Sequence, residues 1–162
     1  MELNPPITFA ALGWDPWLRL IGAAIAGLLL GLDREVRGHG AGMRTHAIMC
    51  FAASLITVTA LALYYQLGGV ESQADPLRVI EGTAAMAGVI GGALIVFSKG
   101  EFKNLTTAAH IWLAASIGIT FGAGLYPLAI IGTVVSVLLL TLFHWIERKT
   151  FGDEEEGGDG QA

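Results

Sequence analysis

Long apolar segments separated by short polar stretches dominate this chain of 162 residues. Most of these segments are close to the ~20 residues that an α-helix needs to cross about 30 Å of hydrocarbon. Hydrophobic residues make up 54% of the chain and charged residues only 14%, which is too apolar for a soluble domain of this size. The pattern predicts an all-α, polytopic membrane protein, a compact bundle of five transmembrane helices at about 16–32, 46–67, 76–98, 107–124 and 126–146.

Basic residues fall unequally on the two sides of this predicted bundle. When the segments are threaded back and forth, seven of the nine Lys and Arg residues lie on one side. Because cytoplasmic loops carry the excess of Lys and Arg, we expect the N-terminus outside and the C-terminus inside. No basic residue precedes the first segment, so we interpret it as a retained helix and not as a signal peptide.

The sequence predicts one membrane domain followed by a tail. Residues 1–149 form the expected five-helix transmembrane domain. The last ten residues contain five acids and no base, and residues 150–162 lack the apolar content that a packed segment needs. We therefore expect 150–162 to be a disordered acidic cytoplasmic tail.

Small residues recur at a spacing of four in three predicted helices: Ala23-Gly27-Gly31, Ala84-Gly88-Gly92 and Ala114-Gly118-Gly122. Such rows let helix backbones approach closely in lipid. A shift of 62 residues also aligns 44–57 with 106–119, and a shift of 60 superimposes the two Asp-Pro helix starts. This favours a parallel repeat of two helix hairpins, the first and second helices and the third and fourth, with coincidence among the abundant alanines as the alternative.

Three ionisable residues lie on these small-residue faces and are candidates for buried polar groups: Arg19, Glu81 and His110. Charged groups are costly inside a membrane and usually have a partner. Since Arg19 and Glu81 follow their helix starts at similar depths, we expect an Arg19–Glu81 pair in the outer half of the bundle. The pair is interpreted either as a structural ion pair or as a cation or proton site, and Arg19 reaching to the surface is a third alternative. For His110, a hydrogen-bonding core residue and a sensor are the alternatives.

Two short motifs surround the junction between the first two predicted helices, Gly-Leu-Asp-Arg-Glu at 31–35 and Ala-Gly-Met-Arg-Thr-His at 41–46. We expect them to form a charged cytoplasmic loop. Asp33 and Glu35 are two residues apart and point to different faces of a helix, which is a poor geometry for holding one metal ion jointly. The arginines suit either contact with anionic lipid head groups or an intramolecular charge cluster. Which metal the chain binds, if any, stays unknown at this point.

With Asp-Pro-Leu-Arg at 75–78 and Leu-Thr-Thr-Ala-Ala at 105–109, these motifs resemble the MgtC/SapB family of bacterial inner-membrane proteins, in order and spacing over roughly residues 16–146. The resemblance implies a compact, multi-pass helical domain of the bacterial inner (plasma) membrane. It also implies a role linked to magnesium limitation, stress or virulence, with control of the ATP synthase and membrane energetics in the family's best-known member. The positions that match the family's polar motifs are Asp33, Arg34, Glu35, Arg44, Thr45, His46, Asp75, Arg78, Thr106 and Thr107.

Several function classes are disfavoured by the residues. The sequence contains no nucleophile–base pair, phosphate-binding loop or His/Cys metal cluster, so we expect neither an enzyme nor a cofactor, and no nucleic acid partner. The favoured prediction is an accessory or regulatory membrane protein that acts through other membrane proteins. The alternatives are a small magnesium or proton transporter along Arg19 and Glu81, which would favour a homo-oligomer, and a lipid-binding stress protein.

Overall fold

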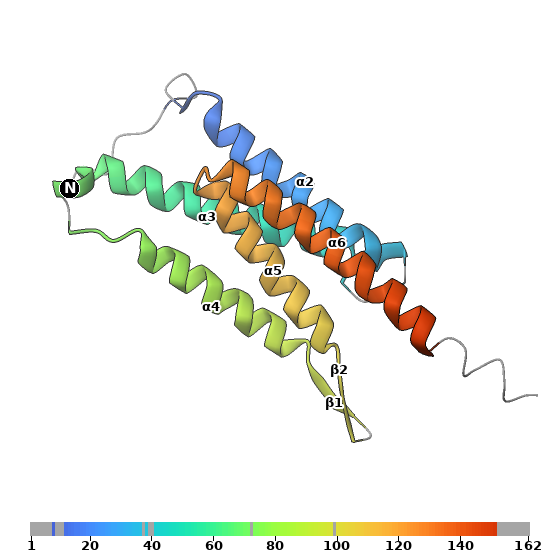
Figure 1. Cartoon of the computed structure of the whole chain (residues 1–162). Helices are drawn as coiled ribbons and strands as arrows, with labels where there is room; N and C mark the ends of the chain where they lie inside the picture. The colour runs from blue at the N-terminus through green and yellow to red at the C-terminus, as the bar shows by residue number, and fades with distance from the viewer. Residues whose placement is uncertain are drawn as a thin grey trace, which may run out of the picture.

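The computed structural model describes residues 8, 12–36, 38, 41–71, 73–98 and 100–151, and beyond residue 142 only the backbone. In this part of the chain, five long helices run up and down: α2 (Asp15–Val36), α3 (Met43–Gln66), α4 (Leu77–Ala93), α5 (Leu105–Gly122) and α6 (Tyr126–Phe151). Helices α2, α4 and α6 run in one direction, and α3 and α5 return (Figure 1). The predicted all-α helical membrane bundle is therefore confirmed, whereas its orientation in the membrane stays a prediction.

Three of these helices, α2, α3 and α5, are long and apolar enough to cross a membrane. Helix α4 has 17 residues and spans about 25 Å. In α6, the stretch Tyr126–Leu142 is apolar over a similar length. The chain is thus a membrane protein with three full-length candidate spans among the described residues, and α4 and α6 lie beside them.

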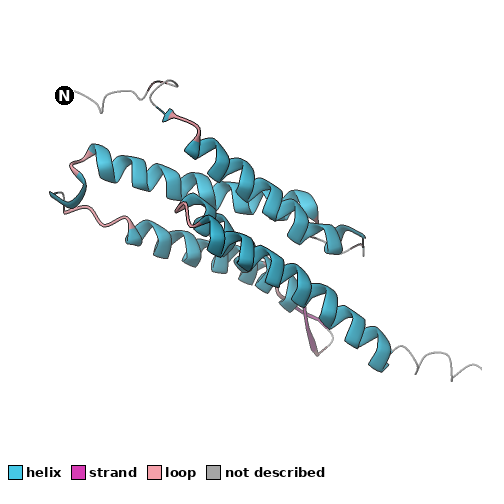
Figure 2. Ribbon diagram, turned by 45° about the horizontal axis from the view of Figure 1, so that its top comes forward, coloured by secondary structure: helices cyan, strands magenta, loops and turns pink. Residues whose placement is uncertain are grey.

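Helices α2, α3 and α5 form the centre of the bundle, because they pack on one another most extensively. Figure 2 shows from a second direction that the long helices lie side by side. Helix α4 packs mainly on α5 and less on α3, while α6 packs on α2 and α5. Small and aliphatic side chains fill the centre, with Ala23, Leu30, Cys50, Ala114 and Ile117 all buried. Small side chains keep the helix axes close, so little space is left between these three helices.

Glycines on α2 and α5 bring both helices against the backbone of α3. A Cβ added to Gly27 would lie 2.5 Å from the His46 carbonyl oxygen, and one on Gly31 would lie 2.5 Å from Met43 Cα. On α5, a Cβ on Gly118 would collide with the Cys50 carbonyl, and one on Gly122 would lie 2.7 Å from the Ser54 carbonyl oxygen. The small-residue faces predicted for α2 and α5 are therefore confirmed as packing faces.

The face predicted for α4 is wrong. Gly88 and Gly92 are exposed, whereas Ala87 and Gly91 are buried. A Cβ on Gly91 would lie 2.9 Å from the Ala108 carbonyl oxygen of α5. Small residues occur all around α4, so their spacing alone did not single out the face that packs.

The connection from α4 to α5 is a β-hairpin, where the sequence predicted a helix to residue 98. Strands β1 (Val96–Ser98) and β2 (Glu101–Lys103) pair antiparallel. Gly100 adopts φ 86°, which suits a tight turn, and the rings of Phe97 and Phe102 lie 5.0 Å apart across the strands. The side chain of Asn104 donates to the Leu94 carbonyl (3.0 Å) and closes the base of the hairpin.

Two other predicted boundaries change. Helix α2 continues to Val36, so residues 33–35 form its last turn and not a loop. Helix α6 continues to Phe151, two residues into the predicted tail, and the rest of that tail, residues 152–162, lies outside the described residues.

Candidate functional site

A buried polar cluster joins α2, α3 and α5 at the end of the bundle that is predicted to be cytoplasmic. Its centre is Arg34, which lies in the last turn of α2 and is only 3% exposed. The Arg34 Nη2 group donates a hydrogen bond to Thr107 Oγ1 on α5, and Arg34 Nη1 lies 3.4 Å from His110 Nδ1 one turn further along α5. A guanidinium from one helix is therefore held by two side chains of another.

His46 adds the contribution of α3 to this cluster. Its side chain is fully buried in the first turn of α3, and its Nδ1 lies 2.8 Å from the Gly42 carbonyl oxygen. Because a carbonyl oxygen only accepts hydrogen bonds, Nδ1 of His46 is the protonated nitrogen. The His46 and His110 rings meet edge to face, with their centroids 6.1 Å apart. The cluster thus contains one arginine and two neighbouring imidazoles.

Two buried atoms of this cluster have no hydrogen-bond partner among the described residues, Arg34 Nε and His46 Nε2. A buried polar atom without a partner costs roughly 1–3 kcal/mol, and such atoms are rare in native structures. Asp33 is half-buried, and its negative carboxylate interacts favourably with the positive charge of Arg34. The cluster therefore holds a buried charge whose hydrogen bonds are only partly satisfied.

Glu35 ties α2 to the start of α3. Its Oε2 accepts a hydrogen bond from the Met43 N–H (3.0 Å), at the first residue of α3. A carboxylate at this position also interacts favourably with the helix dipole. The Glu35 carboxylate lies close to Gly42, and a Cβ at residue 42 would collide with it in this position. The role of Glu35 in the structure is to cap a helix and set the α2–α3 turn.

A second polar cluster lies at the other end of α2. Arg19 Nε donates to Asp15 Oδ2 (2.5 Å), and Arg19 Nη1 donates to the Gly122 carbonyl at the end of α5 (2.8 Å). Asp15 Oδ1 accepts a hydrogen bond from the Tyr126 hydroxyl (2.6 Å). Both guanidinium contacts are made to oxygens, so this arginine is well satisfied although it is only partly buried.

The predicted Arg19–Glu81 pair is wrong. Glu81 is exposed on α4, a helix that packs on α5 and α3, whereas Arg19 belongs to α2. Asp15, four residues before Arg19 on the same helix, is the partner. The sequence analysis did not assign Asp15 and Tyr126 to this cluster. The i, i+4 spacing of Asp15 and Arg19 could have indicated their ion pair.

The MgtC family profile matches residues 20–149, most of the chain. The chain belongs to the MgtC family. Among curated proteins, it is 36% identical over 128 residues to YhiD of Escherichia coli K12, covering 78% of this chain and 60% of YhiD. It is 34% identical over 141 residues to SrpB of Synechococcus elongatus (80% of this chain, 75% of SrpB), and 30% identical over 132 residues to MgtC of Brucella abortus strain 2308 (79% of this chain, 52% of that protein). No solved structure matches the chain.

The structure divides the polar motif positions that were predicted from the sequence into three groups. Arg34, His46 and Thr107 meet in the buried cluster, and His110 joins them. Glu35 and Asp75 cap helices, because Asp75 Oδ1 accepts from the Leu77 N–H (2.9 Å). The remaining positions lie outside the cluster: half-buried Asp33 and exposed Arg44, Thr45, Arg78 and Thr106.

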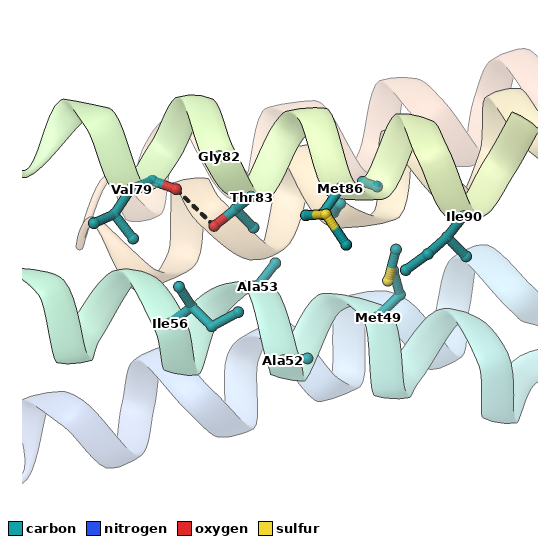
Figure 3. A pocket seen from close by; sticks show the side chains of 11 residues that line it. Met49, Ala52, Ala53, Ile56, Val79, Gly82, Thr83, Met86 and Ile90 are labelled. Carbon is teal, nitrogen blue, oxygen red and sulfur yellow. Dashed lines mark hydrogen bonds between the residues drawn. The ribbon is translucent and has the colours of Figure 1, made fainter.

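One hollow on the surface of this MgtC-family bundle is apolar. It is a groove of about 390 Å³ between α3 and α4 over α5, lined by Met49, Ile56, Met86 and Ile90 among others (Figure 3). The hydroxyl of Thr83, which also lines it, donates to the Val79 carbonyl (2.7 Å). The groove therefore offers apolar contacts and no charged group.

Proposed function

We propose that this MgtC-family chain is an accessory or regulatory protein of the bacterial inner membrane, linked to magnesium limitation, stress or virulence, and acting through other membrane proteins. The link to magnesium is supported by relatives: YhiD carries a name that proposes magnesium transport, and others are named MgtC. The chain spans only 60% of YhiD and 52% of the Brucella MgtC protein, so the activity of those whole proteins enters here as a proposal.

The packing of the bundle centre carries this proposal. The Arg19 and Arg34 clusters lie at opposite ends of α2, and the layer between them consists of Ala26, Leu30, Cys50 and Ala114 with their neighbours. Helices α2 and α5 approach the α3 backbone so closely in this layer that several glycines have no room for a Cβ. A tightly packed apolar layer suits a rigid body that presents surfaces to partners better than it suits an ion path through one chain.

One observation favours a second candidate, a magnesium or proton transporter with its path between subunits. Glu81 lies exposed near the start of α4, a helix whose other charged residue is Arg78. An ion or proton path between subunits would use a carboxylate in this position. Arg19 does not share that location, so this candidate now rests on Glu81 alone.

Ion flux into sealed proteoliposomes separates the two candidates. Purified protein is reconstituted, magnesium and protons are followed with trapped dyes, and Glu81→Gln is measured in parallel. An accessory protein gives no flux above empty vesicles, for either ion and for both proteins. Flux that appears with the parent and disappears with Glu81→Gln overturns the proposal and establishes transport. An ionophore added at the end proves that the dyes respond.

Growth at low magnesium tests the positive side of the proposal. A bacterial strain that lacks its own MgtC-family gene is supplied with this chain or with Arg34→Met. We expect the parent to restore growth and the variant, at equal membrane abundance, to fail. Rescue by a protein that shows no flux identifies a regulatory role, whereas no rescue by the parent contradicts the link to magnesium limitation.

A further inference from the structure

Glycines in the helices differ in what surrounds them. Gly27, Gly31 and Gly118 lie so close to α3 that an added Cβ would meet its backbone at 2.5 Å or less. On α4, by contrast, a Cβ added to Gly92 would meet nothing within 4 Å, and one on Gly88 would meet only the edge of Trp112 at 4.0 Å. Glycine is a poor helix former, so packing within the chain explains the first group and leaves Gly88 and Gly92 unexplained.

Gly88 and Gly92 share one face of α4 with Glu81 and Ala85. The spacings of four, three and four residues place these side chains along one side of a helix, and all four are exposed. Arg78 stands one turn before Glu81 at the edge of this face and is exposed too. Among the described residues, the side chains of Arg78 and Glu81 form no ion pair and no hydrogen bond. The face therefore combines room for a close backbone with two unused charges of opposite sign.

We propose that this face of α4, made by Arg78, Glu81, Ala85, Gly88 and Gly92, binds the same face of a second copy of the chain. Copies that insert in the same orientation are related by a two-fold axis along the membrane normal, so identical residues meet at the same depth. Small residues let the two α4 helices approach closely along this axis. The dimer goes beyond the proposed function and does not depend on it.

Charge decides the choice of partner. Arg78 lies three residues before Glu81, a separation of about 4.5 Å along the helix axis, which a long arginine side chain spans easily. In a two-fold dimer, each Arg78 reaches Glu81 of the other copy, so the face is complementary to itself and two reciprocal ion pairs form. The apolar groove on the other side of α4 carries no such pattern, and its residue Gly82 serves as a control (Figure 3).

Charge reversal provides the decisive test. The chain is fused to donor or acceptor fluorescent proteins at its C-terminus, and association in lipid vesicles is measured by energy transfer. Glu81→Arg and Arg78→Glu each place like charges opposite one another, and we expect each variant alone to dimerise at least about tenfold more weakly than the parent. A one-to-one mixture of the two restores opposite charges at both contacts and recovers the parent affinity.

Every outcome of this test bears on the proposal. Recovery in the mixture also shows that both variants are folded. Parent-like association of either variant alone, or a mixture that associates no better than its components, overturns the proposed pairing. A parent that stays monomeric at all protein-to-lipid ratios overturns the dimer itself.

Steric variants test the glycine part of the face. Gly92→Leu is expected to raise the dimer dissociation constant by about tenfold or more, because two leucines would then separate the helices. Gly82→Leu, the same change on the groove side of the same helix, is expected to leave it unchanged. In a Cys50→Ser background, oxidation is expected to link Ala85→Cys into dimers and to spare Leu138→Cys on α6. The opposite cross-linking pattern would place the interface on α6 and refute the α4 face.

Discussion

Arg19 and Arg34 lie at opposite ends of α2 and are held in opposite ways. Arg19 is partly exposed, and its guanidinium donates to a carboxylate and to a carbonyl at a helix end. Arg34 is only 3% exposed, yet it bonds a hydroxyl and an imidazole and leaves its Nε without a partner among the described residues. The more buried arginine is thus the less satisfied one.

This difference separates burial from stabilisation. A buried charge contributes stability only when its hydrogen bonds and countercharge offset its desolvation, and replacing such a group by an apolar one of similar shape is often neutral. We infer that Arg19 stabilises the packing of α2, α5 and α6, whereas Arg34 serves the function of the protein more than its stability. The free energy of unfolding of variants at the two ends, measured in detergent micelles, tests this inference.

Changing Arg34 in two ways gives the largest expected effect. Arg34→Ala leaves a cavity between α2, α3 and α5 and is expected to lower the free energy of unfolding by about 2–4 kcal/mol. Arg34→Met fills the same space without charge and is expected to change it by less than about 1 kcal/mol. Both are expected to lose rescue of growth at low magnesium. A large loss of stability with Arg34→Met would show that the charge itself stabilises the fold.

Thr107 and its neighbour Thr106 form a matched pair on α5. Thr107 is buried and accepts from Arg34, so Thr107→Val is expected to lower the free energy of unfolding by about 1–2 kcal/mol, because it leaves another Arg34 donor unpaired. Thr106→Val removes the same hydroxyl from an exposed position and is expected to stay within about 0.5 kcal/mol. In an Arg34→Met background, the cost of Thr107→Val is expected to shrink. Equal costs in both backgrounds would mean that the Arg34–Thr107 contact is unimportant.

Arg19→Met tests the other end of α2. Its partners Asp15 and the Gly122 carbonyl lose a donor, but the pair is partly exposed, so we expect a loss of about 1 kcal/mol. Raising the salt concentration is expected to lower the contribution of Arg19 and to leave that of Arg34 unchanged, since exposed pairs are screened more strongly. A loss with Arg19→Met that exceeds the loss with Arg34→Ala would reverse the comparison between the two ends.

The sequence predicts the helices better than it predicts which of their faces pack. Hydropathy locates five helices because each must present apolar residues to lipid along its whole length. On α4, the row of small residues at 84, 88 and 92 lies beside a second row at 83, 87 and 91. The spacing alone does not show which of the two rows packs against the bundle. The shift of 60 residues between the Asp-Pro starts carries Ala23, Gly27 and Gly31 onto Thr83, Ala87 and Gly91, of which Ala87 and Gly91 are buried against α5. The shift of 62 residues that aligns 44–57 with 106–119 carries them onto Ala85, Val89 and Ala93, which are exposed. The weak repeat therefore indicates the packed face of α4 only when its offset is taken from the two helix starts.

The contacts at the candidate site were also harder to predict than the helices that carry them. Arg34 and Thr107 are both among the polar motif positions predicted from the sequence, but they are 73 residues apart and meet only because α2 and α5 both pack against α3. The Arg19–Glu81 prediction assumed that α2 and α4 are neighbours, which the packing contradicts. Sequence position supplies local partners such as Asp15 for Arg19, while distant partners require knowledge of which helices touch.

Changes at Glu35 are expected to have the smallest effect. Glu35 lies next to Arg34 in the last turn of α2, so the two residues can be compared directly. Glu35→Gln keeps an oxygen that accepts from the Met43 N–H but loses the charge that favours the start of α3, so we expect a loss of about 0.3–1 kcal/mol. Glu35→Ala removes the hydrogen bond as well and is expected to cost about 1 kcal/mol or slightly more. Because Glu35 acts on the fold through α3 and not through the buried cluster, both variants are expected to keep rescue of growth at low magnesium. If Glu35→Gln abolishes rescue while the protein stays folded, the α2–α3 turn belongs with Arg34 in the function, and the distinction between capping and functional residues in this turn is lost.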